Sequence, residues 1–160
     1  DGRAFIASTL HLPSEAPRSI AVRMSNPCAR ILPMAEAMAN RFHGDILIAE
    51  SAGFEPGRPL NELAVEAMKE NGIDISGNRS KGVFELFKKG EMYGYVITVC
   101  DESTAERCPV FPGVTKRLHW SLEDPASFTG SFEDRMEQTR AVRESIRKRL
   151  ELLAEEIRGA

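Results

Sequence analysis

The stretch Tyr95-Val96-Ile97-Thr98-Val99, which runs directly into Cys100, is the clearest strand in the sequence. Its residues are β-branched or aromatic, the types that pack well on a pleated sheet. Working outward, turn formers such as Ser25-Asn26-Pro27 and Ser51-Ala52-Gly53 close further apolar runs, as they do at strand ends. These runs predict three more strands, at Ile20–Met24, Asp45–Ala49 and Lys116–Trp120.

Segments with apolar residues at helical spacing accompany these strands. Pro33 lies in the first turn of one of them, where a missing N–H costs little, and Gly72 follows another as a C-cap. The expected helices are Ile31–Phe42, Leu60–Asn71, Val83–Lys88 and Phe132–Arg158. Strands that alternate with helices predict an α/β fold, a three-layer sandwich with a four-stranded parallel sheet covered on both faces.

The bulk composition indicates one globular domain. The chain has 160 residues, of which 42% are hydrophobic and 28% charged, and no apolar run approaches the ~20 residues that span a bilayer. Its net charge of -3 gives no reason to expect nucleic acid or membrane partners. Residues 1–18 lack a clear period and are expected to be an N-terminal extension or a cloning remnant, with the domain at 19–160.

The chain has three cysteines, Cys28, Cys100 and Cys108. A secreted scaffold normally has a denser, even set, so a reducing cytoplasm is expected, where thiols remain available for chemistry. Ligands of parallel sheets bind beyond the carboxyl ends of the strands. The unusual residues of this sequence follow those ends.

The first candidate site is the turn after Met24. Backbone N–H groups and a helix N-terminus favour an oxyanion there, and Arg30 can add a bidentate contact. Cys28 would have a stabilised thiolate in such a place. The plainer interpretation is a buried cysteine and a surface arginine, and the local pattern alone does not decide between the two. The expected oxyanion-binding residues are Ser25, Asn26, Cys28, Ala29 and Arg30.

The second candidate site is the segment from Cys100 to Cys108. Zinc-binding cysteines usually lie two to four residues apart, and no second pair completes four ligands, so no metal is expected. A flexible loop that brings two thiols together for exchange fits better. On this segment alone, two unrelated cysteines are somewhat more favoured.

The third candidate site is Asp124, which follows the last strand. A carboxyl group that faces an anion pocket can act as general acid. An Asp-Pro turn that caps a short helix is the alternative, because this is a common structural role. The single tryptophan, Trp120, is expected in the core.

These pieces resemble the arsenate reductases built on the low-molecular-weight tyrosine phosphatase fold. The resemblance covers roughly Ser19 to Arg158. Its motifs, specific in combination, are Met34-Ala-Glu-Ala37, Ser51-Ala-Gly53, Leu63-Ala-Val-Glu-Ala-Met68, Gly72-Ile-Asp-Ile-Ser76, Ser80-Lys81, Val96-Ile-Thr-Val-Cys-Asp101, Cys108-Pro109, His119-Trp120 and Asp124-Pro-Ala126.

The resemblance implies a mechanism in which a loop cysteine attacks arsenate. The loop arginine, matched by Arg30, holds the oxygens, and the acid, matched by Asp124, protonates the departing oxygen. Cys100 and Cys108 match the relay cysteines, which pass a disulfide to an external thiol donor such as thioredoxin. No bound cofactor is implied.

Two positions of the loop depart from the family pattern. The family's loop runs cysteine, five residues, arginine and then serine or threonine, which places Met24 at the nucleophile position and Ile31 at the hydroxyl position. A thioether has no proton to lose. Three hypotheses follow: an arsenate reductase with a Cys28–Cys100–Cys108 relay, a catalytically impaired oxyanion-binding or regulatory relative, and a tyrosine phosphatase, which would leave Cys100 and Cys108 unexplained.

Overall fold

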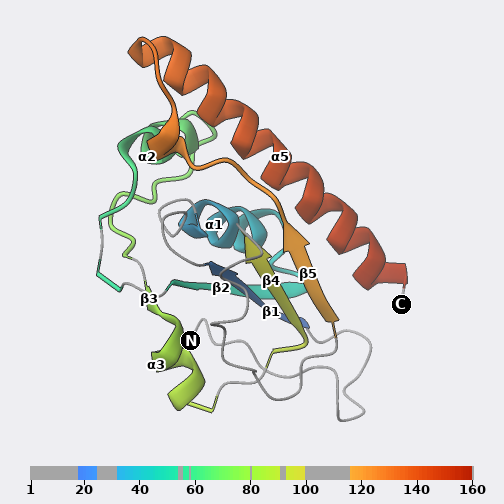
Figure 1. Ribbon diagram of the computed structural model, residues 1–160. Coiled ribbons are helices and arrows are strands. Elements are labelled where there is room, and N and C mark those ends of the chain that lie inside the picture. Colours follow the sequence, from blue (N-terminus) through green and yellow to red (C-terminus); the bar gives the residue numbers. More distant parts are fainter. Residues whose placement is uncertain are drawn as a thin grey trace.

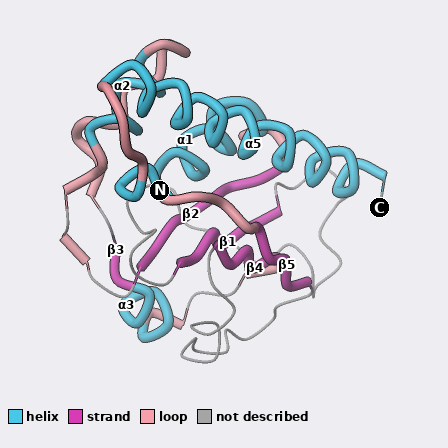
Figure 2. Tube along the Cα trace, turned by 45° about the horizontal axis from the view of Figure 1, so that its top comes forward, coloured by secondary structure: helices cyan, strands magenta, loops and turns pink. Residues whose placement is uncertain are grey.

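The computed structural model describes residues 18–24, 32–53, 56–57, 59–79, 81–90, 93–99 and 116–159. A parallel sheet has the strand order β3-β2-β1-β4-β5. Helices α1, α2 and α5 lie together on one side of the strands, and α3 lies apart from them near β3 (Figures 1 and 2). The expected α/β layering with helices on both faces is therefore confirmed. The strands are β1 (Arg18–Met24), β2 (Leu47–Gly53), β3 (Lys81–Gly82), β4 (Tyr95–Val99) and β5 (Lys116–Trp120).

The expected number of four strands was wrong, because β3 adds a fifth. Its two residues, Lys81 and Gly82, pair with Ala52 and Gly53 of β2. So short a strand carries no hydrophobic alternation for a sequence pattern to reveal. It forms because the end of β2 beside it supplies the partners for its backbone.

The second strand was also placed too early, since Asp45 precedes it and Ser51–Gly53 belong to it. Glu50 and Ser51 made this stretch unlike a buried strand, yet both are buried. Buried polar groups are stable when they are hydrogen-bonded. Glu50 accepts a bond from the Tyr93 hydroxyl at 2.9 Å, and Ser51 N donates to Glu36 at 2.7 Å.

The helices lie close to their expected positions, with small shifts at the ends. Asn61 proves to be the N-cap of α2, since its side chain accepts bonds from Leu63 N and Ala64 N. Gly44 ends α1, and any Cβ there would meet the carbonyl oxygen of Asn40 at 2.5 Å. The observed bounds are α1 (Leu32–His43), α2 (Glu62–Lys69), α3 (Val83–Lys88), a 3₁₀ turn η2 (Pro125–Ser127) and α5 (Phe132–Gly159).

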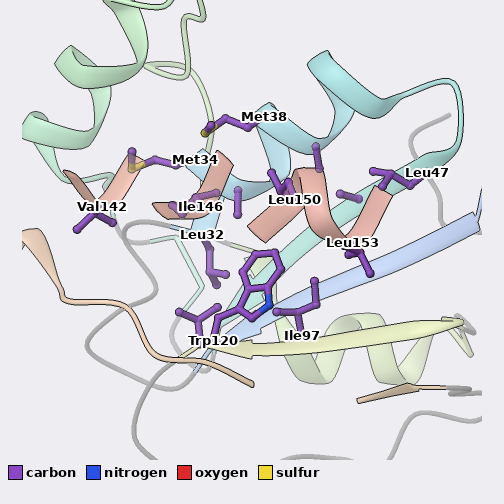
Figure 3. Close-up of a cluster of buried hydrophobic side chains, with 14 of the residues drawn as sticks. Leu32, Met34, Met38, Leu47, Ile97, Trp120, Val142, Ile146, Leu150 and Leu153 are labelled. Carbon is purple, nitrogen blue, oxygen red and sulfur yellow. The ribbon is translucent and has the colours of Figure 1, made fainter. Parts of the chain in front are cut away.

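The main core lies between the sheet and the helices α1 and α5. Trp120 is buried there, beside Leu32 and Ile97 (Figure 3), which confirms its expected place. The apolar stripe of α5 packs on the same core, as the sequence pattern predicts. The stripe consists of Val142, Ile146, Leu150, Leu153 and Ile157.

Helix α1 also fastens the outer edge of β2. Asn40 accepts a bond from Ala49 N at 2.8 Å and donates one to Ala49 O at 3.0 Å. One helical turn earlier, Glu36 takes the N–H of Ser51. Glu36 and Asn40 are four residues apart, which is a rise of about 6 Å along a helix, and Ala49 and Ser51 are two residues apart, which is about 6.6 Å along a strand. The two side chains of α1 are therefore spaced to reach alternate residues of β2.

Candidate functional site

The carboxyl ends of the strands form one edge, which is the expected place for the site. In the register of the sheet, Met24 at the end of β1 lies between Gly53 of β2 and Val99 of β4. Val99 is in turn paired with Trp120, the last residue of β5. The last residues of the adjacent strands β1, β4 and β5 are therefore register partners. The chain continues from them into Ser25, Cys100 and Ser121.

Asp124 is the one expected site residue that the structure describes. It is half-buried and precedes η2, where its Oδ1 atom accepts a hydrogen bond from Ala126 N at 3.0 Å. Its carbonyl oxygen accepts a bond from the Ser127 hydroxyl at 2.7 Å. The capping role considered from the sequence is thus present. It occupies one carboxylate oxygen, and within the described part of the chain Oδ2 has no hydrogen-bond partner.

The other expected site residues lie outside the described residues. They are Ser25, Asn26, Cys28, Ala29, Arg30, Cys100 and Cys108. The backbone register brings together the strand ends that lead to them, and their side-chain roles remain predictions. Among the described residues, no cluster of three or more His, Asp or Glu side chains could hold a metal ion.

A polar network beside the carboxyl edge was missed by the sequence reasoning, which took Glu36, Ser51 and Lys81 only as parts of family motifs and gave Glu50 no role. Lys81 Nζ lies 3.2 Å from Glu36 Oε1 and 4.0 Å from Glu50 Oε1. Glu36 also accepts a bond from the Ser51 hydroxyl. One ammonium group thus lies between two carboxylates, and the network links the start of α1 to β2 and β3. In the sequence, the only indications of this network were Glu36 within the expected helix and Ser51 in the expected turn.

A second missed pair lies on the other side of the edge. The hydroxyl of Thr98 on β4 is 3.0 Å from Nδ1 of His119 on β5, and the histidine is exposed. Both residues stood in motifs of the family resemblance without an assigned role. Only the strand register makes them neighbours.

A cavity of about 380 Å³ lies against the turn that follows Asp124. Its wall mixes polar and apolar groups, with Arg135 as the one cationic side chain. It is lined by Pro59, Leu60, Asn61, Glu62, Leu63, Pro125, Ala126, Phe128, Phe132 and Arg135. A second cavity of about 410 Å³ shares Pro59, Leu60, Glu62 and Phe132 with it. The surface beside the turn that follows Asp124 is therefore hollowed.

No helix in the described ranges combines the length and the apolar character needed to cross a membrane. The sequence matches the family of low molecular weight phosphotyrosine protein phosphatases over residues 22–160. It is 39% identical to an arsenate reductase of Halalkalibacterium halodurans over 123 residues, which cover 76% of this chain and 85% of that relative.

Solved structures agree with the sequence match. An arsenate reductase in its oxidised state has a TM-score of 0.67 and 26% identity, with 86% of this chain and 98% of that one covered. An arsenate reductase in a phosphate-binding state has a TM-score of 0.64 and 28% identity, with 89% and 99% covered. The fold expected from the family resemblance is confirmed.

Proposed function

Because the chain belongs to the low molecular weight phosphotyrosine protein phosphatase family, we propose that it is an arsenate reductase that works through its three cysteines. The observation that carries this proposal is the register of the carboxyl edge. Met24, Val99 and Trp120 end adjacent strands, so the segments with Cys28, Cys100 and Asp124 start side by side. The 39% identity to a relative named arsenate reductase supports the same reaction.

The first step joins a thiolate to arsenic. Backbone N–H groups and the Arg30 guanidinium hold the arsenate oxygens, since a fork of donors matches an oxyanion. The thiolate of Cys28 forms the sulfur–arsenic bond while Asp124 protonates a departing oxygen, which leaves as water. The Oδ1 bond to Ala126 N fixes the carboxyl group and leaves Oδ2 to carry the proton.

The second step is the redox step. The Cys100 thiolate attacks the sulfur bonded to arsenic, and the sulfur–arsenic electron pair leaves with arsenic as arsenite. Two thiols thereby become a disulfide while As(V) becomes As(III). Cys108 then exchanges into the disulfide and carries it to an external thiol donor such as thioredoxin.

The nucleophile deserves a direct test, because Met24 occupies the position where the family has a cysteine. Met24 is the last residue of β1, and Cys28 follows it by four positions. In the proposed enzyme Cys28 attacks from a rebuilt loop. Cys28→Ser then abolishes arsenic transfer, whereas Met24→Leu retains most of it.

The decisive experiment measures arsenate-dependent consumption of NADPH coupled through thioredoxin and its reductase, with glutathione and dithiothreitol as other donors. Turnover that disappears in Cys100→Ser and falls about 100-fold in Asp124→Asn supports the proposal. Failure to turn over with all three donors rejects it.

The presence of Met24 and Ile31 favours one alternative, an oxyanion-binding or regulatory relative without catalysis. Calorimetry with inorganic phosphate would then show binding that Arg30→Ala removes, with no arsenate turnover. Phosphatase activity is the third candidate. Hydrolysis of a nitrophenyl phosphate that survives the loss of Cys100 and Cys108 would establish it.

A further inference from the structure

The cavity of about 380 Å³ lies between η2, the start of α2 and the first turn of α5 (Figure 1). We call it the η2 cavity. It adjoins the cavity of about 410 Å³, because Leu60 and Phe132 are among the residues that line both. Ligand pockets in proteins usually measure about 300–1,000 Å³. The η2 cavity alone is therefore large enough for a small organic molecule.

Arg135, in the first turn of α5, is the one cationic side chain that lines the η2 cavity among the described residues. Within that part of the chain its guanidinium group takes part in no hydrogen bond or ion pair, and its Nε atom is buried. Arg140 and Arg143, further along α5, both hydrogen-bond Glu70 instead. A buried donor without an acceptor is unfavourable, and an oxygen atom of a ligand would satisfy it.

The shape of the guanidinium group selects the chemical group that it binds. Nε and one Nη nitrogen present two parallel N–H bonds, which match the two oxygens of a carboxylate. Glu62 is the one acidic side chain on the same wall among the described residues. It is exposed and lies in the first turn of α2, where the positive end of the helix dipole favours its charge. Since Glu62 is not paired with Arg135, the cation remains available to an external carboxylate.

The rest of the ligand would meet apolar side chains of the η2 cavity. Leu60 and Phe128 are half-buried and pack against the main core, and Phe132 is 56% exposed. Contact with an apolar group removes such surface from water, whereas a hydrated inorganic ion gains nothing from it. The cavity therefore fits a carboxylate that carries an apolar group better than it fits a free oxyanion.

We propose that the η2 cavity binds a small organic carboxylate with an aromatic or branched apolar body. Two N–H groups of Arg135 donate to the carboxylate oxygens, and the apolar body lies against Leu60 and Phe132. Because η2 lines the same cavity, the bound ligand lies against the turn that Asp124 caps. No residue of this site takes part in the proposed reaction, so the inference goes beyond the proposed function and does not depend on it.

The test uses 3-phenylpropionate as the probe, because it joins a carboxylate to an aromatic ring. Its binding to the full ¹⁵N-labelled chain is followed by NMR titration. We expect a dissociation constant of about 1 mM or lower, with the largest shifts at the amides of Leu60, Ala126 and Phe132. Arg135→Gln, which loses the charge and the guanidinium fork, should weaken binding about tenfold or more.

Matched controls separate the contribution of the charge from that of the apolar body. Arg79→Gln removes a cation from the adjoining cavity and should change the affinity less than about twofold, because exposed charges are screened. 3-Phenylpropanol has the ring without the charge, and acetate has the charge without the ring. Each should bind at least about tenfold more weakly than the probe. Circular dichroism confirms that each variant is folded.

Three results would overturn the inference. They are no saturable binding of 3-phenylpropionate up to about 20 mM, equal affinity of the unchanged protein and Arg135→Gln, and displacement of the probe by inorganic phosphate, which would place the probe in the oxyanion loop. The proposed function is judged separately by arsenate turnover. Binding that depends on Arg135 supports this inference whether or not arsenate is reduced.

Discussion

Along the outer side of β2, which β3 covers only at Ala52 and Gly53, helix α1 supplies side chains to the strand. At the opposite edge of the sheet, β5 presents its own polar side chains outward. Asn40 and Glu36 take the free backbone groups of Ala49 and Ser51. On β5, Lys116, Arg117 and His119 are exposed and Trp120 is buried. The polar groups beside β2 thus hold the fold, whereas the polar side chains of β5 lie at the surface, where Lys116 pairs with Glu156 and His119 with Thr98.

The largest expected effect concerns the single buried anchor of the β5 edge. Trp120→Ala should lower the free energy of unfolding by about 3–5 kcal/mol, because it removes a large side chain from the packed core. Urea unfolding followed by circular dichroism measures this loss. Arg117→Ala on the same strand should lower the free energy of unfolding by about 0.5 kcal/mol or less. Equal losses in the two variants would contradict the contrast between the buried Trp120 and the exposed Arg117.

The next effect concerns the β2 edge. Asn40→Ala leaves the N–H and C=O of buried Ala49 without their side-chain partner and should cost about 1–3 kcal/mol in urea unfolding. Arg41→Ala, at the adjacent exposed position of α1, is the matched control and should cost far less. If both variants unfold alike, Asn40 does not fasten the strand.

A smaller effect is expected from the ion network of this edge. Lys81→Met removes the cation between Glu36 and Glu50 and should cost about 1–2 kcal/mol, since the Glu50 side chain is only 10% exposed. Adding Glu50→Gln should recover part of that loss, because the buried charge is then gone. The interaction free energy from this double-mutant cycle is the measurement, and strict additivity would rule out coupling.

The smallest effect is expected away from both edges, between α2 and α5. Arg140 and Arg143 hydrogen-bond Glu70 and lower the pKa of its carboxyl group from 4.5 to about 2. The folded-state pKa is the lower one, so this stabilisation is present above pH 4.5 and is lost as the pH falls towards 2.

The Glu70 side chain is 37% exposed, so solvent screening limits its value to about 0.5–1 kcal/mol at pH 7. Glu70→Gln should flatten the stability profile across this acid range, measured by urea unfolding at several pH values. If the free energy of unfolding of the variant fell as steeply with decreasing pH as that of the unchanged protein, other carboxylates would be responsible for the acid sensitivity.

The sequence predicted those features that depend on local pattern. Tyr95–Val99 and Lys116–Trp120 were placed at the observed bounds, because β-branched runs and turn formers mark strands locally. The apolar stripe of α5 and the burial of Trp120 were likewise predictable. For the site, the sequence selected Asp124, the three cysteines and the turn residues Ser25, Asn26, Ala29 and Arg30, and the structure describes only Asp124 among them.

What the sequence determined by itself was the α/β class, the main helices and strands, and the family, since each rests on local propensity, periodicity or motifs in order. The tertiary structure decided the fifth strand, the extension of β2 through Glu50 and Ser51, and the pairing of Thr98 with His119. Each of these depends on a partner distant along the chain. A buried carboxylate or a two-residue strand is stable only when that partner supplies its hydrogen bonds, and no local pattern records where the partner will be.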